Sequence, residues 1–187
     1  HGSGSAFLPR YRTPGQVTFF GYRSNTTADG ALERWSPQAW YYRGRFGLLG
    51  EYIVSRQDVT AGTGERAMLQ NRAWQLSGGM VLTGEDASYQ GVVRPDHPFT
   101  LGGPGWGALE LVARYGRLEI DDAAFPLFAD PTQAMAAAHG WGLGLNWYLT
   151  RNLKLTANYT RTAFDAAPGA AAREDEQVVF TRAQFSF

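Results

Sequence analysis

The stretch that decides the fold is residues 140–165, which read GWGLGLNWYLTRNLKLTANYTRTAFD. Large apolar residues occupy every second position before a Thr-Arg-Asn turn and resume the same alternation after it. They are Trp141, Leu143, Leu145, Trp147 and Leu149, then Leu153, Leu155, Ala157 and Tyr159. Because successive side chains of a strand point to opposite faces, this two-residue period predicts a β-hairpin with one apolar and one polar face.

The same alternation recurs along the chain and predicts eight strands. The final segment, which ends in RAQFSF, is as regular as the hairpin, and five others are less regular. These five cover residues 16–24, 33–43, 46–56, 72–83 and 106–120. Amphipathic strands of about 9–11 residues have the length needed to cross a bilayer at a tilt. We therefore expect an all-β, antiparallel transmembrane barrel.

The connectors also differ in length. Residues 44–45 and 150–152 form tight turns, whereas 25–32, 58–69, 121–139 and 166–173 are longer. Short turns on one side and longer loops on the other are typical of outer-membrane barrels, with the short turns in the periplasm. The connector 83–105 breaks the pattern, because it falls on the short-turn side and is long.

Composition excludes several classes. The 187 residues carry 17 basic and 17 acidic side chains and no cysteine, so disulfides, zinc-thiolate sites and thiol nucleophiles are excluded. A nucleic-acid partner is not expected, because such domains concentrate basic charge. Aromatic residues make up 14% of the chain although its mean hydropathy is −0.31, so the rings are dispersed over alternating positions.

The terminus carries a local signal for assembly. Phe185 and Phe187 follow Ala183 at alternate positions of the last strand. This pattern is similar to the signal by which bacterial outer-membrane proteins are recognised by the barrel assembly machinery.

Several stretches resemble the phosphate-selective porin O and P family. They are QVTFFGYRSN, QAWYYRGRFGLLGEYI, LTGEDASYQGVVRPDHPF, GWGALELVARYGRLEIDD, AFPLFADP, residues 140–165 and the closing RAQFSF. The resemblance implies a 16-stranded barrel in the outer membrane of a Gram-negative bacterium, usually a homotrimer, that passes anions such as phosphate. It assigns residues 6–187 to the C-terminal half of that barrel, and residues 1–5 are expected to be a linker or tag remnant. It also places the inward-folded loop that narrows the pore in the N-terminal half, so no selectivity-filter residue is carried over.

The polar face supplies the candidate site. Arg34, Arg114, Lys154 and Arg182 are expected to point into a watery lumen, where they would form an anion pathway. Glu51 and Glu110 share that face and weaken the expected anion preference. All basic residues but Lys154 are arginine, which suits bidentate phosphate contacts, but genomic composition explains this bias equally well.

The function expected from these patterns is passive diffusion of small anions. The alternative is a structural barrel that anchors or docks a partner at the outer membrane. No catalytic residue, metal site or cofactor is expected, since no nucleophile has a base within reach. The expected partners are outer-membrane lipid and lipopolysaccharide, the assembly machinery, the N-terminal half of the same barrel and small anions.

Overall fold

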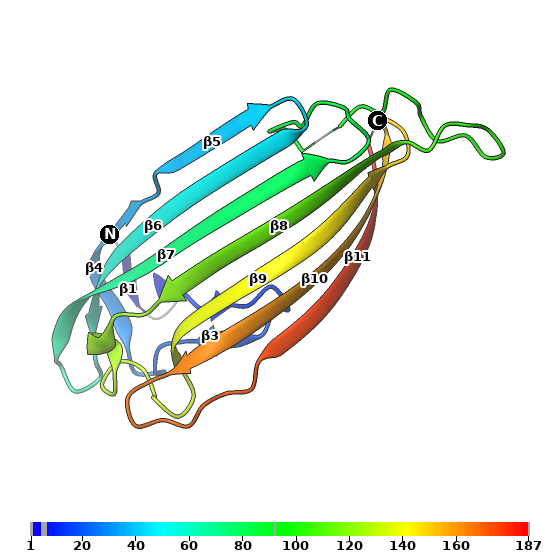
Figure 1. Ribbon diagram of the computed structural model, residues 1–187. Coiled ribbons are helices and arrows are strands. Elements are labelled where there is room, and N and C mark those ends of the chain that lie inside the picture. The colour runs from blue at the N-terminus through cyan, green and yellow to red at the C-terminus, as the bar shows by residue number, and fades with distance from the viewer. Residues whose placement is uncertain (1, 5–6, 92, 187) are drawn as a thin grey trace.

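The computed structural model describes residues 2–4, 7–91 and 93–186 and consists mainly of one antiparallel sheet of long, tilted strands (Figure 1). From β6 to β11 each strand pairs with the next in the chain, and β4 and β5 both pair with β6. Their bounds are β4 Thr27–Trp35, β5 Gln38–Arg43, β6 Phe46–Thr60, β7 Arg66–Val81, β8 Ala108–Glu119, β9 Met135–Tyr148, β10 Leu153–Ala166 and β11 Glu176–Phe185.

The all-β prediction is confirmed. The described ranges contain no α-helix, and the 3-10 turn η2 covers Asp122–Ala124. No helix in that part of the chain has the length and apolar character needed to cross a membrane. The hairpin of residues 140–165 is present as β9 and β10, with Leu155 opposite Trp147 and Tyr159 opposite Leu143.

The prediction of eight wall strands is wrong in one place. Residues 16–24 do not cross the sheet; they contribute the three-residue β3, Thr18–Phe20, which pairs with β2, Tyr11–Arg12, in a separate sheet. The physical reason is that the consecutive rings of Phe19 and Phe20 are both buried, at 3% and 0% exposure, which a wall strand with alternating faces does not allow. Seven long strands remain when β4 and β5 are taken as one, interrupted at Pro37.

The strands also extend further toward the long-loop side than the sequence predicted. The expected connector 58–69 is a turn of residues 61–65 between β6 and β7, and most of 25–32 belongs to β4. At the N-terminus, β1, Gly2–Gly4, pairs with β4. Whether residues 1–5 are a tag remnant stays a prediction.

The two faces of the sheet have opposite character. Residues 7–26 cover one face of the sheet, which we call the inner face. Phe19 packs there against Phe164 of β10, with 6.1 Å between the ring centroids and the rings tilted by 45°. The other, outer face exposes the large apolar side chains. They include Trp35, Tyr41, Phe46, Leu48, Tyr52, Trp74, Leu76, Leu111, Tyr115, Trp141, Leu143, Leu145, Leu155 and Val179. This is the distribution expected of a wall whose outside contacts lipid.

The two ends of the sheet differ as well. The short-turn end holds residues 44–45, 149–152, the long connector 82–107 and the C-terminus (Figure 1). Backbone hydrogen bonds join these segments, for example from Ala87 to Gly44 and from Phe99 to Leu149. The loop end holds 61–65, 120–134 and 167–175, and the main hydrophobic core lies there. In the described residues β11 pairs only with β10, so the sheet is not closed into a barrel.

Candidate functional site: the inner face of the sheet

The four basic residues expected in the lumen share the inner face. Arg114 lies opposite Ser77 of β7 and Gly142 of β9, in the same row as other inner-face residues. Arg34 lies opposite Ser55, and Arg182 lies opposite Thr156. Lys154 lies opposite Tyr148 and Gln184. The structure thus places them on one face, but it distributes them over four strands, β4, β8, β10 and β11, and does not bring them together into one cluster.

The sheet beside Arg114 carries few side chains on its inner face, because glycines occupy inward-facing positions there. Gly116 follows it along β8, and Gly140, Gly142 and Gly144 line β9. A Cβ on Gly144 would lie 2.0 Å from the Asn158 side-chain oxygen, so a larger residue at this position would have to displace that side chain. We call these four residues the glycine lane. It leaves the Arg114 side chain free to extend into open space.

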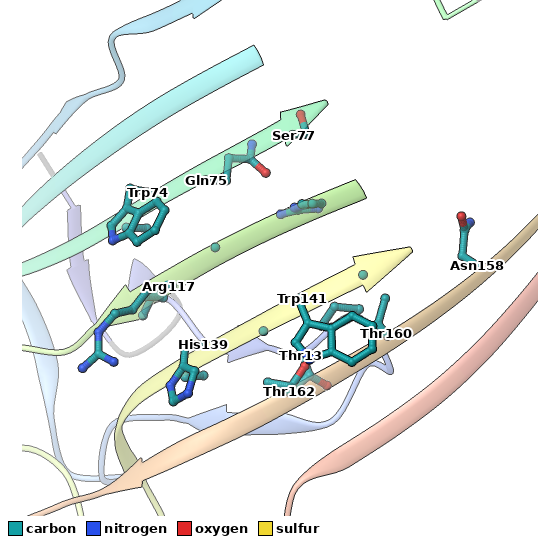
Figure 2. A pocket seen from close by; sticks show the side chains of 18 of the residues that line it. Thr13, Trp74, Gln75, Ser77, Arg117, His139, Trp141, Asn158, Thr160 and Thr162 are labelled. Carbon is teal, nitrogen blue, oxygen red and sulfur yellow. The ribbon is translucent and has the colours of Figure 1, made fainter. Parts of the chain in front are cut away.

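That space is a cavity of about 600 Å³ between the wall and the inward-folded segment, residues 7–26. Figure 2 shows side chains that line it, among them Gln75 and Ser77 from β7, Asn158 and Thr160 from β10, and Thr13 from the segment. Such a volume is enough for a small organic solute.

Sequence reasoning missed two arginines of this cavity. Arg12 and Arg117 line it together with Arg114. Only residues 16–24 of the inward-folded segment were expected to form a strand, so Arg12 was not considered. The run of adjacent rings at Phe19 and Phe20, which fits no two-residue period, is the signal that could have shown that this segment is buried.

Glu51 is held on the inner face next to Arg114. Its carboxylate accepts hydrogen bonds from Ser36 at 2.7 Å and from the Gln75 amide at 2.6 Å. Arg114 is close enough to interact with this carboxylate electrostatically, but within the described ranges no carboxylate lies within 4.0 Å of its guanidinium. Glu51 therefore offsets part of the charge of Arg114 and leaves its N–H donors free.

Lys154 has a different environment from the arginines. Its Nζ donates to the Tyr148 hydroxyl at 3.1 Å and lies 4.6 Å from the centre of that ring. The same hydroxyl lies 2.9 Å from Glu110 and 3.1 Å from the carbonyl oxygen of Gly91 in the connector 82–107. Glu110 also accepts a hydrogen bond from Asn146 at 2.9 Å. Lys154 thus belongs to a polar network that ties the connector to the wall.

The inward-folded segment is a feature that the sequence patterns did not predict. Residues 7–26 fold onto the inner face at the loop end. Phe19 and Phe20 pack there among Leu69, Phe128 and Phe164. Burial raises the pKa of the Tyr22 hydroxyl in this segment to about 12. The segment is therefore packed into the core and does not lie loosely in the lumen. The pore-narrowing loop expected from the resemblance in the N-terminal half stays a prediction.

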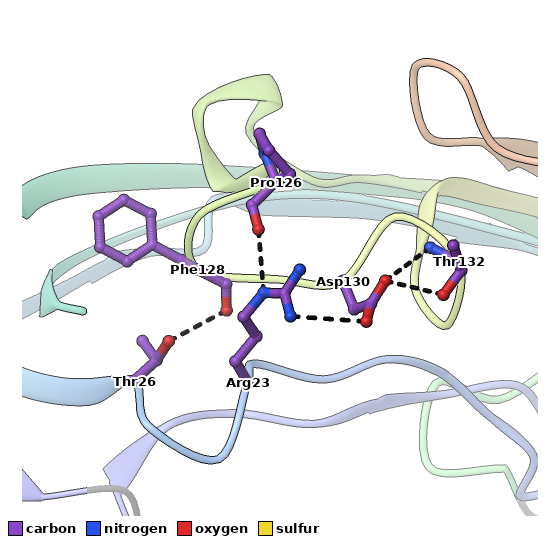
Figure 3. A network of polar contacts seen from close by, with 6 residues as sticks. All are labelled: Arg23, Thr26, Pro126, Phe128, Asp130 and Thr132. Carbon is purple, nitrogen blue, oxygen red and sulfur yellow. Dashed lines mark hydrogen bonds and ion pairs between the residues drawn. The ribbon is translucent and has the colours of Figure 1, made fainter. Parts of the chain in front are cut away.

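Arg23 fastens this segment to the loop 120–134 (Figure 3). Its Nε donates to the Pro126 carbonyl at 3.0 Å, and its backbone N–H donates to the Phe128 carbonyl at 2.8 Å. The Thr26 hydroxyl donates to the same Phe128 carbonyl at 3.1 Å.

Asp130 completes the fastening. Its carboxylate lies 3.5 Å from Nη1 of Arg23 and accepts hydrogen bonds from the backbone N–H and the hydroxyl of Thr132, at 2.9 and 2.8 Å. These bonds, that from the Thr132 backbone above all, and the nearby Arg23 hold the pKa of Asp130 below its ordinary value. Two segments about 100 residues apart in sequence are thus locked together at the loop end.

Rings on the outer face form pairs that suit a membrane interface. Trp74 packs on Tyr115 at 5.4 Å and Trp141 on Tyr159 at 5.3 Å between centroids. Arg117 lies opposite Trp74, and its guanidinium contacts Glu119 at 2.7 Å and Asp165 at 2.8 Å. Rings that lie beside charged groups are expected where lipid meets water.

The predicted assembly signal is only partly described. Phe185 lies on the outer face opposite Leu153 and is 67% exposed. Phe187 lies outside the described residues. That these residues form an assembly signal stays a prediction.

Comparison with known proteins agrees with this architecture. The family model "Phosphate-selective porin O and P" matches residues 4–187. A search of the curated proteins found no match to this chain. Proteins of the matched family are porins without enzymatic activity, and they sit in the outer membrane of Gram-negative bacteria. Since the match extends over nearly the whole chain, the protein belongs to the phosphate-selective porin O and P family and is located in the outer membrane.

Proposed function

We propose that this chain forms part of a water-filled pore through which small anions, phosphate among them, diffuse passively across the outer membrane. The observation that carries the proposal is the cavity on the inner face, which is lined by Arg12 of the inward-folded segment and by Arg114 of β8. Fixed positive charge in a lumen raises the local concentration of anions, and transit requires that binding be weak enough for release.

Three of the four predicted pathway residues keep this role in the proposal, and one loses it. Arg34, Arg114 and Arg182 are the proposed anion contacts on the wall, with Arg12 added from the segment. Lys154 donates to Tyr148 and lies near Glu110, so its charge is balanced locally. We assign it to fastening the connector.

The pore requires more strands than the seven described here, because bacterial barrels of this kind have an even number and no open edge. We propose that the sheet is completed by strands of the same polypeptide into a 16-stranded barrel, and that the barrels assemble as homotrimers with the help of the assembly machinery. The apolar outer face supports contact with lipid.

The test is a measurement of reversal potentials in a potassium chloride gradient, with the whole protein inserted in planar bilayers. We expect preference for chloride, and Arg114→Ala should lower the chloride-to-potassium permeability ratio about threefold, because one of the few fixed charges of the path is removed.

Arg151→Ala is the matched control. This arginine lies in the exposed turn 149–152 at the short-turn end, and its side chain contacts only the neighbouring Asn152 among the described residues, at 3.3 Å. Its removal should leave the ratio unchanged. Preference for potassium in the wild-type pore, or equal effects of the two substitutions, would contradict the proposal.

A further inference from the structure

The cavity on the inner face is lined by apolar side chains as well as by charged groups. Three guanidiniums and one carboxylate, of Arg12, Arg114, Arg117 and Glu51, line it together with neutral polar side chains such as Gln75, Asn158 and Thr160. Its apolar side chains include Phe19, Ile53, Val112, Leu118 and Phe180. The glycine lane adds backbone without polar side chains. A lining of this kind does not match the dense, fully polar shell that a small, strongly hydrated ion requires when it loses water.

We propose that this cavity is a binding site for organic monoanions that carry an apolar or aromatic body, and that the pore prefers them to inorganic phosphate. The inference rests on the proposed function, since it names the class of anion that the same path favours.

The net charge of the cavity matches a solute that carries one negative charge. Arg117 is paired with Glu119 and Asp165, so its charge is already balanced. Arg12 and Arg114 contribute two further positive charges and Glu51 one negative charge, which leaves one positive charge in the cavity. A monoanion neutralises that charge. Inorganic phosphate is partly dianionic at neutral pH, and its extra charge would face Glu51, which is fixed in place by Ser36 and Gln75.

The apolar contact is offered by Phe180. This ring lies on the inner face of β11, opposite Asn158, and is 43% exposed, so it is open to a passing solute. Three strand spacings separate β11 from Arg114 on β8, about 14 Å, and both side chains extend into the same cavity. An anion held at Arg114 can therefore direct its apolar body across the glycine lane toward Phe180. Burial of a ring against a ring is favourable, whereas phosphate gains nothing from this contact.

Three anions separate the possibilities in bi-ionic measurements on the whole protein in planar bilayers. Benzenesulfonate and methanesulfonate carry the same charged group, stay ionised at pH 7 and differ by the ring. Inorganic phosphate is the third probe. We expect the permeability of benzenesulfonate relative to chloride to exceed that of the smaller methanesulfonate about threefold, and benzenesulfonate to block the chloride current at lower concentrations than phosphate.

Phe180→Ser should abolish the advantage of benzenesulfonate while the chloride-to-potassium ratio stays as in the wild type. Phe180→Leu, which keeps an apolar side chain of similar size, should retain part of it. The matched control is Val179→Thr, one position along β11 on the outer face, which should change neither ratio.

The outcomes separate this inference from the proposed function. A pore that prefers potassium overturns both. A pore that prefers anions but is blocked by phosphate at lower concentrations than by benzenesulfonate overturns the inference alone, as does a Phe180→Ser pore with the wild-type preference.

Discussion

The two ends of the sheet both carry chain folded onto the inner face, but they hold it by different means. At the loop end, residues 7–26 are held by buried rings, with Phe20 fully buried among Tyr22 and Phe125. At the short-turn end, the connector 82–107 is held around Tyr148, whose hydroxyl lies within hydrogen-bond distance of Gly91, Glu110 and Lys154. The comparison teaches that the lumen is shaped at one end by apolar packing and at the other by a few directional bonds.

The largest effect is expected from the loop end. Phe20→Ala removes a ring from the core and should destabilise the packing of residues 7–26 by about 3–5 kcal/mol. Limited proteolysis should then cleave this segment, and single-channel conductance should rise because the cavity loses one wall. The control is Phe7→Ala, since Phe7 is 59% exposed in the same segment. Equal protease resistance of the two variants would show that burial of Phe20 does not hold the segment.

The short-turn end is tested by Tyr148→Phe, which keeps the ring and removes the hydroxyl. Tyr148 is 2% exposed, so the loss should cost about 1–3 kcal/mol and loosen the connector 82–107. Lys154 would then lose the hydroxyl that accepts its hydrogen bond, and its ammonium group would be more available to solutes. The chloride-to-potassium permeability ratio should therefore rise slightly. Protease cleavage within the connector and reversal potentials report the two effects. If cleavage moves to residues 7–26 instead, the two ends are not independent.

Arg23→Ala should have a smaller effect at the loop end. It removes the bond to the Pro126 carbonyl and the ion pair with Asp130, both at the surface, and should cost about 0.5–1.5 kcal/mol. Urea-dependent protease accessibility of residues 120–134 measures it. Arg23→Lys retains the charge and should recover only part of the loss, since it cannot reproduce both contacts of the guanidinium.

The smallest effect is that of pH on Asp130. Its pKa in the folded protein lies below the ordinary value of 3.8, so its contribution to stability is present above that value and is lost as the pH falls through the lower folded-state pKa. Protease accessibility of the loop 120–134 should therefore be unchanged between pH 7 and pH 5 and should rise only in strong acid. Asp130→Asn should remove this dependence on acid. A transition near pH 5 that Asp130→Asn abolishes would contradict the depressed pKa.

Local periodicity was sufficient to predict the wall, because the face of a strand residue depends only on odd or even position. For that reason Arg34, Arg114, Lys154 and Arg182 could be assigned to one face without coordinates. The pairing of Lys154 with Tyr148 also follows from the tight turn between β9 and β10, which places the two residues opposite each other.

The inward-folded segment could not be predicted in this way. Its position depends on contacts between residues about 100 positions apart, such as Arg23 with Pro126, which no local period encodes. Arg12 was missed for the same reason. The cavity is therefore formed by one surface that the sequence pattern predicts and one that only the tertiary packing of Phe19 and Phe20 positions.

The glycine lane has a consequence for how such a pore can change over generations. The glycine lane offers few side chains that a mutation could alter, and a larger residue at Gly144 would have to displace the Asn158 side chain. Under the proposed function, the solute preference then depends on a handful of positions around the lane, Arg114 and Phe180 among them. A lineage that meets a new nutrient could change its uptake by single substitutions at those positions, while the apolar outer face of β8 and β11 stays the same.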